Sequence, residues 1–422
     1  MNRAKHAETI FAQLTIIVSL LLGPLTTAII VTMLSPEDQG QYYVLTALGA
    51  LIGVLHLGDL ETAITGIDRT DMASFDIAVL GLVFSRLVAL VLCCLVILLM
   101  VYCTTMLGTN ARQAKLSVFY FLLITANALV AVPHQLSQAL AQPYWRRRFY
   151  EFATYSLVLI AGLFLARDTT ALIFAVAASI LANCLFSSRV LLVTGFLKFY
   201  GSRFLLDAVA FWRMRIFPRQ RSVGLAHIYS QIGYRLLVPI ASESLGVVFA
   251  GKIGATLSVL GFSLGLLQQR LRVRFPKLAH LQNEASKSRA PMLRRVENKA
   301  SFQIGLGVIA SGVAMAVGLA ELSDRYAWMK DRFLLPGEVL ILTSVLAVVG
   351  IAGVNAAFRF ATATDKSRDF WLIVSIAAAV ALPIVGAGLA GVLGFWVGAL
   401  VGPILIFLVF RTAAFLSKLD VN

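Results

Sequence analysis

Long apolar runs constrain this chain more than any other feature of its sequence. They recur from end to end of the 422 residues, and most are long enough for a helix to cross a ~30 Å hydrocarbon core. Only 14% of the residues are charged and 59% are hydrophobic, whereas about a quarter of an average soluble domain is charged. The sequence therefore predicts an all-α polytopic membrane protein. It excludes a soluble enzyme, a disordered tail and a secreted disulfide scaffold.

Twelve apolar segments are predicted to span the membrane. They are residues 9–34, 42–67, 77–102, 114–141, 152–166, 170–195, 223–240, 246–267, 302–322, 339–361, 370–389 and 392–410. The fifth is the shortest. The first contains Gly23-Pro24 and lacks a small-residue cleavage site, so it is interpreted as a retained helix rather than a signal peptide.

The basic residues alternate between the two sides of these spans. With the N-terminus in the cytoplasm, 26 of the 36 Lys and Arg residues fall on inside segments, 6 on outside loops and 4 within spans. Cytoplasmic loops of membrane proteins carry such an excess. We therefore expect both termini in the cytoplasm. The net charge of +15 then reflects orientation, and no nucleic-acid partner is predicted.

The chain divides into two predicted halves. Residues 196–221 mix aromatic and basic side chains, as a helix lying in the membrane interface does. We expect an N-terminal six-helix lobe (1–195), this cytoplasmic amphipathic linker (196–221) and a C-terminal six-helix lobe (222–422). The windows 34–43 and 240–249 share Glu37/Glu243 and Gly40/Gly246. This faint similarity favours a parallel repeat around a central cavity, as in transporters.

Ionisable groups inside spans are expensive and are therefore candidate functional residues. They are Asp59, Glu61, Arg86, Arg189, Arg235 and Lys252. Asp59 and Glu61 lie at a depth similar to that of Arg86, which predicts either a functional ion pair or a structural bridge. Arg235 and Lys252 are expected at comparable heights, with Glu243 in the adjoining outer loop as a partner. Arg189 lies close enough to the cytoplasmic end to snorkel.

Polar side chains line up with these cations. His227, Gln231 and Arg235 share one face of the seventh span, and Gln135, Gln138 and Gln142 share one face of the fourth, near Asn127 and His134. Such stripes line a wet cavity or form interhelical hydrogen bonds. The candidate substrate-binding residues are Arg235, Lys252, Arg86, Gln231, His227 and Gln138. The candidate ion-coupling residues are Asp59, Glu61, His56 and His134. No catalytic residue, metal site or cofactor is predicted.

Local motifs resemble the polysaccharide-transporter family of the multidrug/oligosaccharidyl-lipid/polysaccharide (MOP) flippase superfamily. The matching positions are Pro36-Glu37, Gly40, Tyr42-Tyr43, Gly58-Asp59-Leu60, Arg235, Glu243 to Gly246 and Phe275 to Leu278. The order Gly-Asp-Leu replaces an Asp-Leu-Gly-like end, and Leu236-Leu237 stand where the family usually has an Asp. The resemblance implies two six-helix lobes around a cavity. It also implies a Wzx-type flippase for undecaprenyl-pyrophosphate-linked O-antigen or exopolysaccharide units in a bacterial inner membrane. Glycan polymerase machinery is a candidate partner. The energy source is left open between an ion gradient, of H⁺ or Na⁺, and the membrane potential.

Two other functions are weighed against this one. A cation-coupled multidrug exporter of the same superfamily needs buried acids, whereas the predicted spans hold two acids and four bases, a balance that favours an anionic ligand. A membrane glycan polymerase or ligase needs a sizeable outer loop with catalytic groups, and the longest predicted outer loop, about residues 323–338, is short. The sequence therefore favours a transporter over an enzyme.

Overall fold

The structure is a computed structural model and describes residues 2–55, 111–130, 144–193, 233–272, 290–360 and 366–419, with residues 91, 94, 98, 206, 209, 210, 213 and 214. The regular structure within these residues is helical, and no strand occurs among them. Five helices in this portion are long and apolar enough to cross a membrane: Phe149–Ala166, Val247–Gly265, Arg295–Arg325, Trp328–Ala352 and Ile373–Leu405. The chain is therefore an all-α, multi-pass membrane protein. The third predicted span (77–102) lies almost wholly outside the described residues.

The chain forms two compact units. Unit 1 comprises Met1–Leu34 and Gly49–Gly224, and unit 2 comprises Ser35–Leu48 and Leu225–Asn422. The short segment Ser35–Leu48 thus packs with unit 2, although it lies in the N-terminal half of the sequence. The lobes predicted at 1–195 and 222–422 and the linker 196–221 remain predictions, since most of 194–232 lies outside the described residues.

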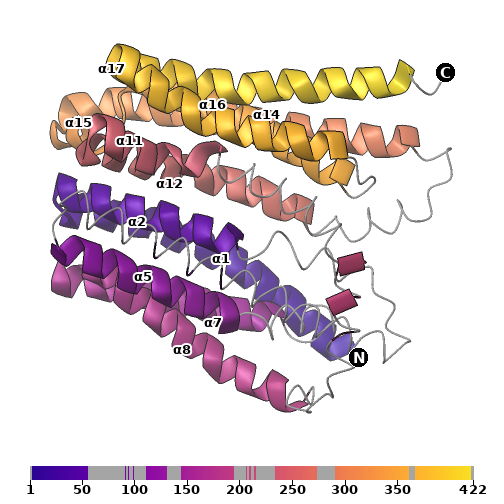
Figure 1. Ribbon diagram of the computed structural model, residues 1–422. Coiled ribbons are helices and arrows are strands. Elements are labelled where there is room, and N and C mark those ends of the chain that lie inside the picture. Colours follow the sequence, from indigo (N-terminus) through magenta and orange to yellow (C-terminus); the bar gives the residue numbers. More distant parts are fainter. Residues whose placement is uncertain are drawn as a thin grey trace. The chain divides into compact units, whose positions relative to one another are not determined.

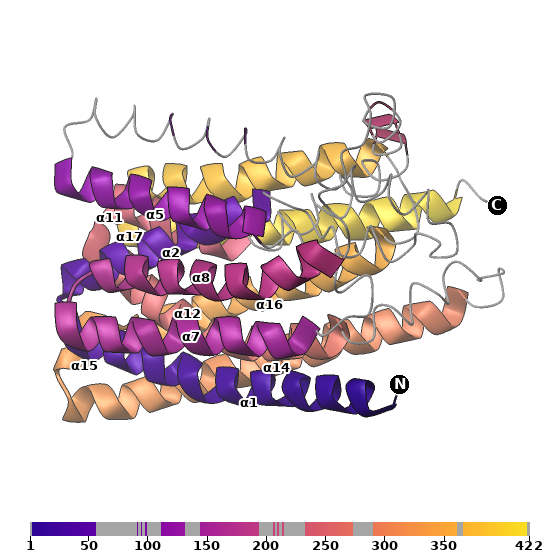
Figure 2. The same ribbon diagram turned by 90° about the horizontal axis from the view of Figure 1, so that it is seen from below.

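Unit 1 contains four described helices, which are α1 (Asn2–Met33), α5 (Ala111–Val130), α7 (Tyr144–Ala166) and α8 (Thr170–Val193). Figure 2 shows α7 between α1 and α8. A Cβ added at Gly162 would lie 3.0 Å from the Cβ of Ala171, so α7 and α8 approach closely near their turn. Asp168 stabilises that turn, because its Oδ1 accepts a 2.9 Å hydrogen bond from the backbone N–H of Thr170.

The start of α7 corrects one sequence prediction. The fifth span was expected to begin at residue 152, but the helix begins at Tyr144 and has 23 residues. The aromatic and basic residues before 152 therefore belong to the helix. Long arginine side chains can keep their charge at the membrane surface while the backbone remains helical. The fifth span is thus long enough to cross the bilayer, and it includes Glu151.

Unit 2 contains the start of α2 (Pro36–Leu55) and six further described helices (Figure 1). They are α11 (Leu237–Leu245), α12 (Val247–Arg272), α14 (Ala290–Arg325), α15 (Trp328–Arg332), α16 (Pro336–Phe360) and α17 (Lys366–Leu419). Helices α14 and α16 pack against each other, with Gly312 against Thr343 and Gly305 against Ile351. The fully buried Val339, Leu342 and Val345 of α16 form part of the core of this unit.

Helix α17 consists of two helices that pack against each other. Ala390 and Gly391 have non-helical backbone angles, with φ of 56° at Gly391, which confirms the break predicted between residues 389 and 392 (Figure 1). The second half places Gly394, Gly398 and Gly402 at four-residue spacing. Any Cβ at Gly394 would collide with the carbonyl oxygen of Gly386, and one at Gly398 with that of Leu382. These glycines permit backbone contact between helices, as small residues do in membrane proteins.

The two similar windows, residues 34–43 and 240–249, place the break between their helices at different positions. In the first window α1 ends at Met33 and α2 begins at Pro36, so Gly40 lies inside a helix. In the second window Gly246 separates α11 from α12 and has φ of 99°. The two glycines therefore have different roles: a side chain at Gly40 would collide with the backbone of Val247, whereas Gly246 adopts a conformation that other residues rarely take.

The glycine contacts in α17 can be tested with two identical substitutions. Gly398→Ala should lower the free energy of unfolding by about 1–3 kcal/mol, because its methyl group meets backbone atoms that cannot move aside independently. Gly388→Ala is the matched control, since a Cβ there meets nothing within 4 Å. Thermal unfolding of the purified protein in detergent measures both. Equal melting temperatures for the two variants would contradict the close packing of the α17 halves.

Candidate functional site

Two of the residues predicted to bind substrate lie in the described portion, namely Arg235 and Lys252. The remaining substrate and ion-coupling candidates lie outside the described residues. They are Arg86, His227, Gln231, Gln138, Asp59, Glu61, His56 and His134. The site is therefore built from the first two and from the polar groups that the structure itself brings together.

Arg235 is half-buried in the helical turn that precedes α11. Its Nε donates a 3.3 Å hydrogen bond to the hydroxyl of Tyr234, and its Cζ lies 5.7 Å from the centroid of the Tyr234 ring. A guanidinium at this distance is attracted by the electron-rich ring face. Within the described residues no carboxylate forms an ion pair with Arg235.

The expected ion pair between Arg235 and Glu243 does not form, although the structure describes both residues. The helix continues to Leu245, so Glu243 is an exposed residue of α11 instead of a loop residue. No ion pair joins it to Arg235, which lies about two turns earlier, in the helical turn before α11. The helix ends only where Gly246 adopts its positive φ angle. Arg235 is therefore left without this carboxylate.

The direction of Arg235 follows from its neighbour Gly233. A Cβ at Gly233 would lie 3.0 Å from a methyl group of Val349, so this side of the helix faces α16. Two residues further on, Arg235 points about 200° away around the helix. It lies about 15 Å along the helix from Leu245. Arg235 is thus a cation on the side of its helix opposite α16.

Lys252 donates a hydrogen bond to a backbone carbonyl of α15. Its Nζ donates a 2.8 Å hydrogen bond to the backbone oxygen of Lys330 in α15. It lies about 8 Å along α12 from the start of that helix. The expectation that the two cations lie at comparable heights stays a prediction. Lys252 ties α12 to α15.

A buried glutamine connects the same helices. Gln39 is 1% exposed, and its Nε2 donates hydrogen bonds to the carbonyl oxygens of Gly251 (3.1 Å) and Arg332 (3.0 Å). Arg332 donates back to Gln39 Oε1 at 3.3 Å. We call this the Gln39 network, which consists of Gln39, Gly251, Lys252, Thr256, Lys330, Arg332 and Leu334. The sequence analysis missed Gln39 because it was placed in a loop.

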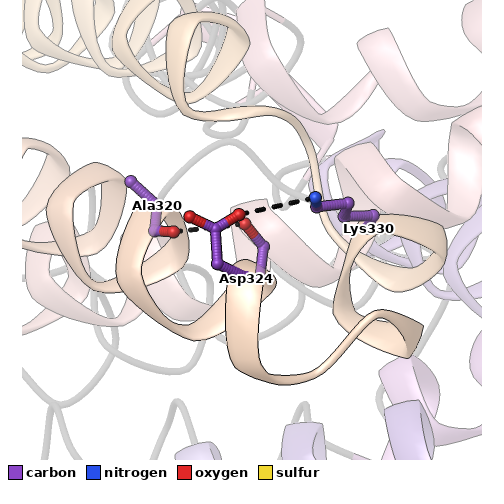
Figure 3. Close-up of polar contacts among 4 residues, drawn as sticks. Ala320, Asp324 and Lys330 are labelled. Carbon is purple, nitrogen blue, oxygen red and sulfur yellow. Dashed lines mark hydrogen bonds and ion pairs between the residues drawn. The ribbon is translucent and has the colours of Figure 1, made fainter.

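Small residues bring the backbones of the network together. A Cβ at Gly251 would lie 3.0 Å from the backbone nitrogen of Gly40, and one at Gly254 would collide with the ring of Tyr43. The starts of α2 and α12 therefore meet almost backbone to backbone. Beside them an exposed ion pair joins Asp324 to Lys330 at 3.5 Å (Figure 3). Such a surface pair contributes little stability, so the Gln39 network is the main polar connection of this region.

A second polar cluster, in unit 1, was also missed by the sequence analysis. Asn183 of α8 is fully buried, and its Nδ2 donates to Asn127 Oδ1 (2.8 Å) and to Glu151 Oε1 (3.0 Å). Glu151 had been placed on the cytoplasmic flank of a span that was drawn too short. The aromatic residues Tyr144, Trp145, Phe149 and Tyr150 were the available signal, since aromatic belts mark the membrane interface.

Comparison with solved structures identifies the fold, although no protein-family model and no curated protein matches the sequence. One match is a multidrug resistance MATE family transporter of the MOP superfamily in an inward-facing conformation, with a TM-score of 0.64, 14% identity and coverage of 96% of this chain and 99% of that chain. Another is the lipid II flippase MurJ in an inward closed conformation (TM-score 0.61, 13% identity, 96% and 87%). A third is MATE in complex with MaD3S (TM-score 0.51, 14% identity, 97% and 95%). The chain has the fold of MATE transporters and of MurJ.

The MATE/MurJ fold covers nearly the whole chain. The expectation of a MOP-type fold is therefore confirmed. The polysaccharide-transporter family within that superfamily stays a prediction, because identities of 12–16% show the fold alone. The substrate has to be inferred from the side chains.

The Gln39 network gives a prediction for this MATE/MurJ fold. Gln39→Leu should lower the free energy of unfolding by about 1–3 kcal/mol, because the buried carbonyls of Gly251 and Arg332 lose their shared donor. Gln41→Leu is the matched control, since Gln41 is half-buried on the same helix. Thermal unfolding in detergent measures both. A Gln39→Leu protein as stable as the control would show that the network does not hold α2 on α12.

Proposed function

We propose that this protein is a flippase that moves an undecaprenyl-pyrophosphate-linked oligosaccharide across a bacterial inner membrane by alternating access. The cargo would be an O-antigen or exopolysaccharide unit, and both termini would lie in the cytoplasm. The fold supports this proposal, since a lipid II flippase shares it over 96% of this chain. The motif resemblance to polysaccharide transporters supports it independently.

Arg235 carries the proposal. A pyrophosphate is multiply anionic and cannot cross hydrocarbon bare, so a flippase must offset the loss of its hydration with cations. A guanidinium matches phosphate oxygens with two parallel N–H donors and remains charged when partly buried. Arg235 lies within the predicted span 223–240, points away from α16 and forms no ion pair with a carboxylate among the described residues. It is therefore the best-placed described group for the head group.

The other predicted substrate-binding residues contribute less to this proposal than Arg235 does. Lys252 has two further protons to donate besides the one bound by Lys330, but that bond gives it a structural role first. Arg86, Gln231, His227 and Gln138 stay proposed cavity residues. The prenyl tail would stay in lipid while the head group passes between the two lobes. Partners would be membrane lipids, a coupling ion (H⁺ or Na⁺) and glycan polymerase machinery.

A multidrug exporter is the second candidate. Its support is the MATE fold, with a TM-score of 0.64, and the placement of Glu151 inside a candidate membrane span. That placement adds an acid to Asp59 and Glu61, the two acids predicted within spans. A site for cationic drugs needs such acids. The solved neighbours named above are transporters and flippases, which is consistent with a protein that is not an enzyme.

Deletion of the gene separates the two functions. In a flippase deletion strain, a lipid-linked glycan should accumulate on the cytoplasmic face and the surface polymer should disappear, with both restored by the intact gene. Drug sensitivity with normal surface polymer and no glycan accumulation would favour the exporter. Labelling of glycan on each face of membrane vesicles provides the measurement.

The role of Arg235 predicts a specific loss of transport. Arg235→Ala should slow translocation by about tenfold to a hundredfold, the effect of losing about 1.5–3 kcal/mol of hydrogen bonding to a charged group. Arg235→Lys should retain part of the rate, because lysine keeps the positive charge but lacks the paired N–H donors of the guanidinium group. Arg325→Ala, at the exposed end of α14, is the control and should translocate at the wild-type rate. Wild-type transport by Arg235→Ala would remove Arg235 from the site.

A further inference from the structure

The helix that carries Arg235 is interrupted directly after this residue. The backbone is helical through residues 233–235, Leu236 stands outside a helix, and α11 begins at Leu237. Leu236 itself keeps helical angles, with φ of −67° and ψ of −17°. The regular pattern resumes where the N–H of Ile240 donates a 3.0 Å hydrogen bond to the carbonyl oxygen of Leu236. The interruption therefore lies in the hydrogen bonding and not in the backbone angles of Leu236.

Pro239 accounts for this interruption. In an α-helix the carbonyl oxygen of Arg235 would accept a hydrogen bond from the N–H of residue 239, but proline has no N–H. Within the described residues no other backbone N–H and no side chain donates to this oxygen instead. The Arg235 carbonyl is thus an acceptor for which the described part of the protein supplies no donor.

Such a carbonyl needs a polar partner at this place in the chain. Arg235 lies within the predicted span 223–240, and unsatisfied backbone groups are not left facing hydrocarbon. They are tolerated where they are buried in protein or line a water-filled cavity. In transporters, the unwound carbonyls of interrupted helices can bind the transported species. The carbonyl and the guanidinium of Arg235 therefore both call for a polar ligand.

The free carbonyl lies on a face of the helix that is not part of the apolar core. Positions 239 and 242 are about 40° and about 20° from Arg235 around the helix axis. Arg235, Pro239 and Ser242 are all half-buried. The buried side chains of α11 point elsewhere around the helix, and they are Leu237, Val238, Ile240 and Ala241. Because its missing donor would come from position 239, the carbonyl belongs to the half-buried face.

The two polar groups of Arg235 select different parts of one ligand. Tyr234 occupies only the Nε donor, so the N–H groups on both Nη atoms can bind two phosphate oxygens. The carbonyl oxygen only accepts hydrogen bonds, so its partner must be a hydroxyl or an amide N–H and not a phosphate oxygen. It points along the helix toward Leu245, as helical carbonyls do. A sugar attached to a pyrophosphate carries both kinds of group next to each other.

We propose that the backbone carbonyl of Arg235, left free by Pro239, binds a hydroxyl or amide N–H of the sugar attached directly to the pyrophosphate. The guanidinium then holds the phosphate, and the sugar extends from it toward the Leu245 end of α11. This inference rests on the proposed flippase function. It extends the site from the pyrophosphate to the first sugar of the glycan.

Two replacements of Pro239 that differ in a single N–H test the proposal. Pro239→Ala restores a donor for the Arg235 carbonyl, whereas lactic acid, the α-hydroxy analogue of alanine, removes the proline ring without adding an N–H. Native mass spectrometry of the purified full-length protein measures binding of undecaprenyl-pyrophosphate-linked glycan and of undecaprenyl pyrophosphate without sugar. Pro239→Ala should bind the glycan-bearing lipid about threefold to tenfold more weakly than the wild type, the effect of one hydrogen bond. Its binding of the sugar-free lipid should not change.

The lactic acid variant should bind both lipids as the wild type does, because it leaves the carbonyl free. Pro403→Ala, the same change inside α17, is the control and should also bind both as the wild type does. Unchanged glycan binding by Pro239→Ala overturns the proposal, and so does equal weakening for the two lipids. Weak glycan binding by the lactic acid variant overturns it as well, because the proline ring rather than the free carbonyl would then be responsible.

Arg235→Ala keeps the inference separate from the proposed function. If it weakens binding of both lipids while Pro239→Ala weakens neither, the role of the guanidinium stands and only the role of the carbonyl is overturned. A wild-type protein that binds neither lipid overturns the flippase function, and the inference falls with it.

Discussion

Backbone contact between helices is the physical constraint on which both units depend. In lipid there is no hydrophobic force between helices, so close packing and internal hydrogen bonds must hold them together. Gly162 meets Ala171 in unit 1, and Gly398 meets Leu382 in unit 2. The approach of Gly40 to α12 has the same origin, and it brings Gln39 within reach of the Gly251 carbonyl. The Gln39 network therefore forms where Gly40 and Gly251 let two helices approach.

The two units share α2. Its first residues, Ser35–Leu48, pack in unit 2, while the helix continues from Gly49 in unit 1. Glycine packing and the Gln39 network hold the first segment on α12. The first turns of α2 are therefore fixed to unit 2 by contacts with residues far away in the sequence.

The sequence predicts the ends of a helix where a change in composition sets them. It does not predict helix ends that are set by packing between helices or by the membrane interface. Ala390-Gly391 interrupts a long apolar run, and the break between the halves of α17 follows from that alone. The start of α7 was missed because Arg146 to Arg148 resemble a loop, although arginine tolerates the membrane surface in a helix. The contacts of Gln39 could not be predicted. They join it to Arg332, 293 residues away, through a backbone carbonyl that no sequence pattern encodes.

The placement of charge sharpens the choice between an anionic and a cationic cargo. The balance of acids and bases predicted within spans decides little, because Lys252 donates a hydrogen bond to a backbone carbonyl. Position decides more, because Glu151 belongs to unit 1 whereas Arg235 belongs to unit 2. Glu151 accepts a hydrogen bond from the fully buried carboxamide of Asn183 inside its own unit. Arg235 forms no ion pair with a described carboxylate and points away from α16. A cation placed in this way favours the proposed anionic cargo.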